Sequence, residues 1–282
     1  MPSFDTPGPI SVTAHVDAGS LQFTAGDRTD TVVEVRPRDP KKDLDVRTAD
    51  QTEVTYASGV LTVRTPKPSL FGLGRTGVVD VTVDLPTGSR VDATGAWSQV
   101  LGEGRLGEVD VKTSSGDVRL DATGPLKLTA AHGSITVDRV EGPAEITTSS
   151  GSLRVGVVDG PAVLKNSHGT TIVGAATGEL RVNGVNGDVD IARAEDSVTA
   201  TNVHGALRVG EVVRGTVQLE TNHGGVEVGV REGTAAWLDV SSGRGQVRNT
   251  LTASEAPGDS EETVKIRART RYGNIDIRRA RA

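Results

Sequence analysis

Histidine is the residue type of this chain whose placement most suggests a chemical site. Four of the five histidines directly precede a glycine: His132, His168, His204 and His223. Imidazole is a common zinc ligand, and His204 and His223 should lie next to each other if the repeat is regular. Zinc takes three or four ligands, however, and only the poor ligands Asn202 and Asn222 stand near this pair. Polar residues before glycine are also typical of turns. We therefore interpret these four histidines as polar residues suited to a turn, and we predict no metal and no cofactor.

A pair of carboxylates is the second candidate. Asp188 and Asp190 are two residues apart, so they would share one face of a β-strand. Most glycoside hydrolases use two carboxylates that face the same substrate bond as their catalytic groups. Aromatic residues that could hold a sugar ring make up only 2% of the chain. We therefore predict that the protein is not an enzyme and has no catalytic residues; a carbohydrate-active β-helix enzyme is the least favoured alternative.

These residues belong to a repeat of about 18 residues that runs from Gly116 to Gly243. In each unit a small or polar residue and an anchor glycine precede alternating apolar positions, as in Ser150-Gly151-Ser152-Leu153-Arg154-Val155. A second turn signal, often Gly-Pro, follows about nine residues after most anchor glycines. Alternation with period two between turns is typical of β-strands, and a short fixed period indicates stacked coils.

The repeat predicts an all-β fold, a single-stranded parallel β-solenoid with about 18 residues per coil and a right-handed path. Equivalent residues would align in columns ~4.8 Å apart. Residues 1–94 are strand-like but irregular and predict a β-rich N-terminal capping region. Residues 95–282 predict the solenoid, with an acidic insertion at 252–262 in the last-but-one coil and the final strands from 264 to 277. An antiparallel sandwich is the alternative fold.

The composition and charge of the chain limit the classes of partner and the cellular compartment that we expect. The net charge of −6 argues against a dedicated nucleic-acid binder, and the chain has no apolar run of 18 residues that could span a membrane. The chain has no cysteine, and its first residues lack the basic and apolar regions of a signal peptide. We therefore expect a cytoplasmic protein that neither binds nucleic acid nor spans a membrane.

Several motifs resemble one protein family. They are the Ser-Ser-Gly repeats at 114–120, 149–155 and 241–247, the Val-Asp-Leu-Pro stretch at 83–86 and the closing Arg-Tyr-Gly-Asn-Ile-Asp-Ile at 271–277. They are similar to a bacterial, commonly actinobacterial, β-strand-repeat family of domains of unknown function, often labelled "putative adhesin". The resemblance implies a β-repeat protein without established catalytic residues. In architecture the solenoid also resembles bactofilins, whose β-helices polymerise end to end.

Large apolar residues on loops are the candidate partner contacts. Leu70, Phe71 and Leu73 stand in a Pro/Gly-rich loop, and Trp97 lies outside the regular repeat. Such side chains can anchor a partner, or they can plug the end of the solenoid. We predict a non-enzymatic scaffold or adhesin-like protein that binds an unknown protein partner. The alternative is a self-assembling structural protein that polymerises end to end.

Overall fold

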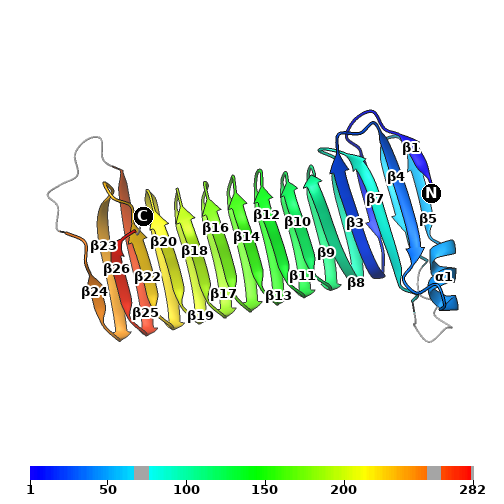
Figure 1. The fold of residues 1–282 in the computed structure, drawn as a ribbon. Helices are drawn as coiled ribbons and strands as arrows, with labels where there is room; N and C mark the ends of the chain where they lie inside the picture. The colour runs from blue at the N-terminus through cyan, green and yellow to red at the C-terminus, as the bar shows by residue number, and fades with distance from the viewer. Residues whose placement is uncertain (67–75, 253–261, 281–282) are drawn as a thin grey trace. The chain divides into compact units, whose positions relative to one another are not determined.

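The computed structural model describes residues 1–66, 76–252 and 262–280, in two compact units, Met1–Glu141 and Gly142–Ala282. Within each unit the strands alternate between the two sides of a coil, and strands one coil apart pair in parallel (Figure 1). The predicted all-β parallel solenoid is therefore confirmed. Its handedness stays a prediction.

Unit 2 contains five regular coils of two strands each. These strands are β13 (Ala144–Ser150), β14 (Leu153–Val158), β15 (Ala162–His168), β16 (Thr171–Ala176), β17 (Leu180–Asn186), β18 (Val189–Ala194), β19 (Val198–His204), β20 (Leu207–Val212), β21 (Gly215–His223) and β22 (Val226–Val230). Residues 18 or 19 apart pair in register, for example Leu207 with Val226. Alternate side chains point inward and are buried. Burial of each large apolar side chain contributes about 1.5–3 kcal/mol to the stability of the fold.

The anchor glycines set how closely the coils approach. In unit 2 they adopt φ angles between +132° and +158°, which residues with a side chain rarely adopt. A Cβ atom on Gly187 would lie 2.2 Å from the carbonyl oxygen of Gly169, the anchor of the neighbouring coil. The predicted last anchor, Gly243, is wrong, because Gly245 has the positive φ and approaches Gly273.

A column of buried polar side chains ties each anchor to the next coil. Asn166 Nδ2 donates to the carbonyl of Gly151 at 3.1 Å, and Asn202 Nδ2 donates to that of Gly187 at 2.7 Å. Threonine takes this role elsewhere, as where Thr221 donates to Gly205 at 3.1 Å. These bonds satisfy backbone carbonyls that the turn leaves unpaired inside the protein.

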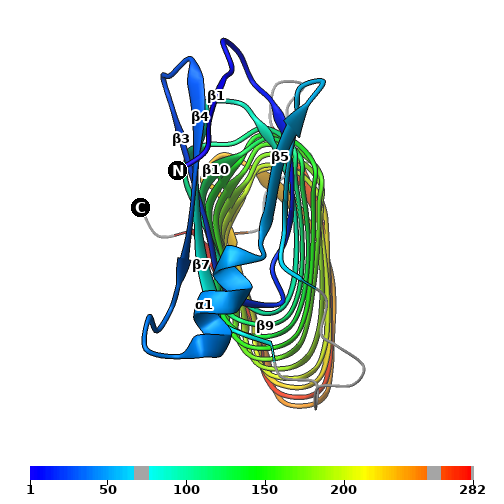
Figure 2. The ribbon, with the colours of Figure 1, turned by 90° about the vertical axis from the view of Figure 1, so that its right-hand side faces the viewer.

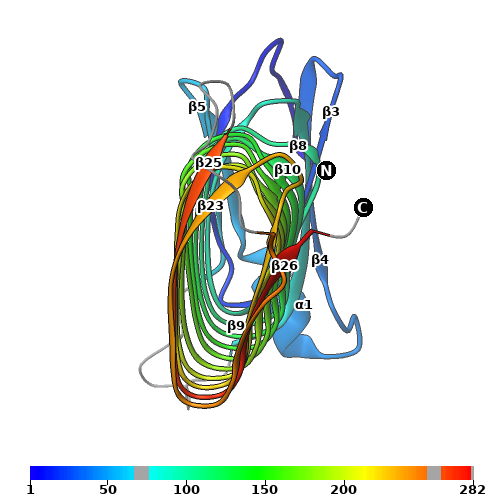
Figure 3. The same ribbon diagram turned by 90° about the vertical axis from the view of Figure 1, so that its left-hand side faces the viewer.

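The last coils of unit 2 are not stacked in chain order. β23 (Ala235–Arg244) and β24 (Val247–Asn249) form the outermost coil, while β25 (Thr263–Tyr272) and β26 (Ile275–Arg279) lie between it and the coil of β21 and β22 (Figure 3). Strands are present in the segment expected to hold the final strands, 264–277, but they form the last-but-one coil of the stack rather than its end. Most of the predicted acidic insertion, 253–261, lies outside the described residues.

Unit 1 shows the same inversion at its beginning. Its strands are β1 (Ser3–Asp5), β2 (Ser11–His15), β3 (Ala18–Gly26), β4 (Asp30–Pro37), β5 (Glu53–Ala57), β6 (Val60–Arg64), β7 (Val79–Pro86), β8 (Arg90–Arg105), β9 (Val109–Ser115), β10 (Val118–Thr123), β11 (Leu126–His132) and β12 (Ile135–Val140). The coil of β2 and β3 pairs on one side with β6 and β7 and on the other with β8. The predicted domain boundary at 94/95 falls inside β8 and stays a prediction.

A helix completes the N-terminal elements of unit 1, together with the antiparallel strands β1, β4 and β5 (Figure 2). This helix, α1 (Asp43–Asp50), was not predicted, because five of its eight residues are polar and no side chain caps its start. Its Asp45 is buried and accepts hydrogen bonds from the backbone N–H groups of Asp39 and Val78, at 3.3 and 2.9 Å. Burial of Asp45 therefore fixes the loops on either side of α1.

Replacing an anchor glycine tests the close approach of the coils. We expect Gly187→Ala to lower the free energy of unfolding by about 3 kcal/mol, because the added Cβ meets a backbone carbonyl and φ is positive. Gly233→Ala is the matched control, since its φ is +80° but no atom lies within 4 Å of the new Cβ; about 1–2 kcal/mol is expected there. Equal losses in urea denaturation would contradict a role for the close approach.

Candidate binding surface

The position before each anchor glycine lies at a corner of the coil and forms an exposed column. His204 and His223 are neighbours in this column, and their rings stack with centroids 5.0 Å apart and planes 4° apart. Tyr272 continues the stack, 4.7 Å from His223 and 2° from parallel. Arg244 ends it, with its guanidinium carbon 5.5 Å from the centre of the Tyr272 ring. The expected adjacency of the two histidines is confirmed.

The sequence reading missed Tyr272 and Arg244 as members of this corner column. It extended the repeat in chain order and therefore put Ser242 at the corner after His223. The signal was present, because Tyr272-Gly273-Asn274-Ile275 has the same order of corner residue, anchor glycine and apolar residue as His223-Gly224-Gly225-Val226. Among the described residues no three potential metal ligands cluster, so the stack is a packed ladder of rings.

Trp97 belongs to the corresponding corner column of unit 1. Strand pairing puts it in register with Ser115, which in turn pairs with His132. The prediction that Trp97 lies outside the repeat is therefore wrong. Its side chain is 70% exposed, so it does not plug the core. The other predicted contacts, Leu70, Phe71 and Leu73, lie outside the described residues.

Strand β25 carries a stripe of positive charge in unit 2. Its outward positions are Lys265, Arg267, Arg269 and Arg271, which we name the basic stripe. Arg267 and Arg269 both bind Asp239 of β23, at 3.2 and 2.6 Å. The two guanidinium groups, Arg269 first, lower the pKa of Asp239. In the described part of the chain neither Lys265 nor Arg271 has an ion pair.

Two hollows flank the basic stripe. The first, of about 290 Å³, is lined by Thr216, Gln218, Trp237, Leu238, Asp239, Lys265, Ile266 and Arg267. The second, of about 580 Å³, is lined by Thr201, Asn202, Glu220, Thr221, Asn222, Ser241, Gly243, Arg269, Thr270 and Arg271. Both hollows therefore lie on the outward face formed by β21, β25 and β23, and side chains of the stripe line both.

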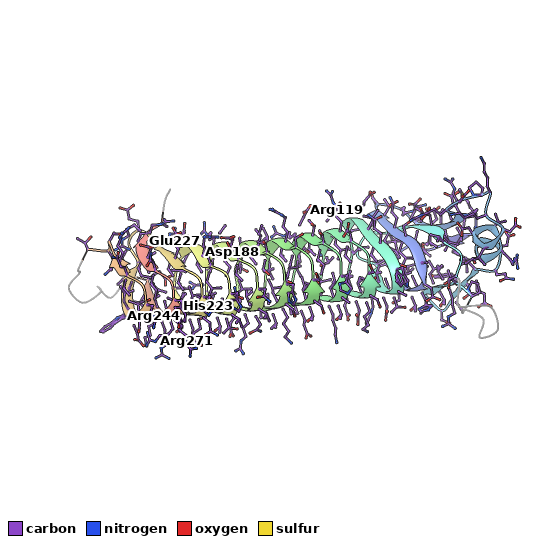
Figure 4. The ribbon with its side chains drawn as sticks, turned by 90° about the horizontal axis from the view of Figure 1, so that it is seen from below. Arg119, Asp188, His223, Glu227, Arg244 and Arg271 are labelled. Carbon is purple, nitrogen blue, oxygen red and sulfur yellow. The ribbon has the colours of Figure 1, made fainter. Side chains whose placement is uncertain are left out.

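Several charged side chains on the other long side of unit 2 are paired with one another. Arg208 bonds to Asp188 at 3.0 Å and to Asp190 at 3.1 Å, and Glu227 bonds to Arg278 at 2.6 Å. Figure 4 shows Asp188 and Glu227 along one edge of the ribbon and His223, Arg244 and Arg271 along the opposite edge. Arg208 thus pairs with Asp190 of the neighbouring coil, and exposed pairs of this kind contribute little stability.

The outermost coil of unit 2 leaves its core positions uncovered. Val226, Ile275 and Val247 occupy one inward column, and their exposed fractions are 1%, 0% and 45%. On the other side of the coil Val217 and Ile266 are buried, while Leu238 in the same column is partly exposed. Trp237, beside Leu238 on the outward face, is 66% exposed.

These features define a class: a β-solenoid repeat protein with an open end coil and a basic outward face. The family comparison matches residues 10–280 to the Toastrack DUF4097 family, and the chain belongs to that family. The actinobacterial origin that the sequence resemblance implied stays a prediction. A search of curated proteins found no match.

Solved structures from Parabacteroides species are similar to the chain at low identity. Two are described as a "putative adhesin", from Parabacteroides distasonis ATCC 8503 and Parabacteroides merdae ATCC 43184. Each is 16% identical; they cover 81% and 80% of this chain and 95% and 94% of their own, with TM-scores of 0.45 and 0.44. A "putative lipid binding protein" from Parabacteroides distasonis is 12% identical, covers 98% of this chain and 95% of its own, and has a TM-score of 0.33. At these scores the likenesses decide nothing about function.

The described residues contain no helix with the length and apolar character needed to cross a membrane.

The pairing of Asp188 makes a pH-dependent prediction. The backbone N–H of Ala206 and the Arg208 guanidinium lower the pKa of Asp188, so its contribution is present above the unfolded pKa, near 4, and is lost as pH falls through the lower folded value. We expect Asp188→Asn to lower the free energy of unfolding by about 0.5–1 kcal/mol at pH 7, since the pair is partly solvent-screened.

Urea denaturation of Asp188→Asn and wild type at pH 7 and pH 3 measures this effect. The difference between the two proteins should shrink at pH 3. Glu232→Gln, at an exposed turn carboxylate, is the control and should match wild type at both pH values. A loss for Asp188→Asn that is the same at pH 7 and pH 3 would exclude the charge as its cause.

Proposed function

We propose that the protein is a non-enzymatic, adhesin-like scaffold that binds a protein partner at the open end coil formed by β23 and β24. The single observation that carries this proposal is the inward column that changes from 0% exposure at Ile275 to 45% at Val247. Apolar core positions that face water at the end of a stacked protein are a surface that a partner can cover.

The backbone of β23 supports the same proposal. Ala235 N–H bonds toward β25, so in a parallel ladder the alternate residues Ala236, Leu238 and Val240 direct their N–H and C=O groups to the opposite side. Among the described residues β23 pairs only with β25, which leaves that side open. An extended segment of a partner can add there as a further strand and cover Leu238 and Val240.

The chemistry of the carboxylates supports a role other than catalysis. A general acid needs a pKa raised toward the working pH. Asp188 instead has a lowered pKa, because it accepts the Ala206 N–H and binds Arg208. Asp188 and Asp190 are both held by one arginine, which suits coil-to-coil pairing.

End-to-end self-assembly is the second candidate, because an open coil is also a surface for another copy. Charge disfavours it. Residues 235–280 carry eight arginines and lysines and six acids, a small positive balance in a chain whose net charge is −6. Two such ends would repel each other, whereas a partner strand with acidic side chains would be attracted.

The compartment and the remaining predicted contacts stay part of the proposal. The proposed compartment is the cytoplasm. Trp97, with its exposed ring, is kept as a second proposed contact, and Leu70, Phe71 and Leu73 are kept as further proposed contacts.

A lysine at the open coil tests the proposal. We expect Val240→Lys to abolish capture of the partner from native cell lysate, because a charge would then stand on the surface to be covered. Val185→Lys is the matched control, since Val185 is 40% exposed on β17, away from the end coil. All three proteins should have the same melting temperature, because Val240 is only partly buried.

Each outcome decides between the candidates. A protein that is retained by wild type and Val185→Lys but lost from Val240→Lys supports the end-coil contact. Retention by Val240→Lys would rule it out and direct attention to Trp97. A wild-type oligomer in sedimentation velocity that Val240→Lys dissociates would support self-assembly instead.

A further inference from the structure

The basic stripe and its two hollows form one continuous outward surface, distinct from the open end of the coil. Gln218, Arg267 and Asp239 lie side by side across β21, β25 and β23, and Glu220, Arg269 and Ser241 form the next row. Successive basic side chains along β25 are two residues apart, so their Cα atoms are ~6.6 Å apart. The surface therefore offers a row of cations about 20 Å long.

Part of this positive charge is available to a ligand. Asp239 engages Arg267 and Arg269, while Lys265 pairs in register with Thr216 and Trp237, and Arg271 with Asn222. On the opposite side of unit 2, by contrast, Arg208, Arg248 and Arg278 all bind carboxylates. An anionic ligand is therefore attracted to the stripe rather than to the opposite side.

Aromatic side chains stand at both ends of the stripe. Trp237 is 66% exposed and lines the hollow beside Lys265. Tyr272 is 39% exposed and follows Arg271. The Trp237 side chain has an apolar body with a polar tip, which suits the apolar face and polar rim of a sugar ring. The ring faces of Tyr272 are covered by His223 and Arg244, so only its exposed edge and hydroxyl can contact a ligand. The composition gave no hint of this arrangement, because the few aromatics of the chain are far apart in sequence and reach the two ends of the stripe only when β25 lies beside β23.

The uncharged and acidic neighbours of the stripe favour a polyhydroxyl ligand. Gln218, Asn222 and Ser241 can both donate and accept hydrogen bonds, while Glu220 and Asp239 only accept them. Sugar hydroxyls supply the donors that these carboxylates need. A nucleic acid carries a phosphate at every nucleotide and would place some of them against Glu220 and Asp239.

We propose that the face of β21, β25 and β23 binds an acidic polysaccharide, a glycan chain that carries carboxylate or sulfate groups. Arg271 and Lys265 pair with its acidic groups, the guanidinium doing so with two parallel hydrogen bonds. Trp237 packs against a sugar ring, and the amides and carboxylates bond to its hydroxyls. This site is separate from the protein contact proposed for the end coil.

Calorimetric titration with defined probes tests the site. The probes are heparin oligosaccharides for sulfate and polygalacturonate oligomers for carboxylate, with dextran, single-stranded DNA and a poly-glutamate peptide as comparisons. We expect at least one acidic glycan to bind, with an affinity that falls as salt rises, and dextran not to bind. Arg271→Ser and Trp237→Ala should each weaken the binding at least tenfold while leaving the melting temperature unchanged.

Matched variants separate this proposal from general charge and from the end-coil contact. Arg248→Ser removes an exposed arginine of the outermost coil on the opposite side, and Val240→Lys alters the end coil. Both variants should bind the glycan within twofold of wild type. The proposal is overturned if neither acidic glycan binds, if Arg248→Ser weakens binding as much as Arg271→Ser, or if DNA or poly-glutamate binds more tightly than both glycans.

Discussion

The close stacking of one anchor glycine on the next is the constraint on which the rest of this fold depends. Each anchor presents its carbonyl oxygen to the place where the next anchor would carry a Cβ, about 2 Å away. No side chain fits there, so every regular coil of unit 2 must turn at glycine, and the turn fixes the register of both flanking strands. A buried asparagine or threonine donates a hydrogen bond to the same carbonyl and so ties each turn to the turn of the neighbouring coil. Regular columns of core and surface residues follow from this single contact.

Because the turn fixes the coil, the outward positions are free to vary. On one side of unit 2 they carry pairs such as Arg208 with Asp190, which neutralise each other between coils. On the other side they carry the basic stripe and the stacked rings of His204, His223 and Tyr272. The same repeating backbone therefore presents two surfaces of different chemistry, and specificity is a property of the columns rather than of a single loop.

The repeat predicted the fold well, because glycine spacing and apolar alternation are local signals that every regular coil repeats. The repeat did not predict the order in which the last coils stack, because that order depends on contacts between residues far apart in the sequence. Nothing in residues 235–279 states locally that β25 lies inside β23, so Gly243 was taken as the anchor and Tyr272 was left out of the corner column. Helix α1 was missed for a different reason: its eight, mostly polar residues are held by the hydrogen bonds of Asp45 to Asp39 and Val78, which no sequence pattern reveals. The proposed contact surfaces were missed for the same reason as Tyr272, since they form only when β25 lies between β21 and β23.

The inserted coils also order the folding of each unit. β25 pairs with β21 on one side and β23 on the other, so the coil formed late in the sequence bridges two that were synthesised before it. β23 has no strand to pair with in its final position until β25 has paired with β21. Residues Ala235–Asn249 therefore stay unpaired while the rest of the chain is synthesised. The loss of structure should follow the reverse path. Local unfolding should begin in this internal stretch of the sequence, while the strands near the end of the chain stay protected from hydrogen exchange between two neighbours.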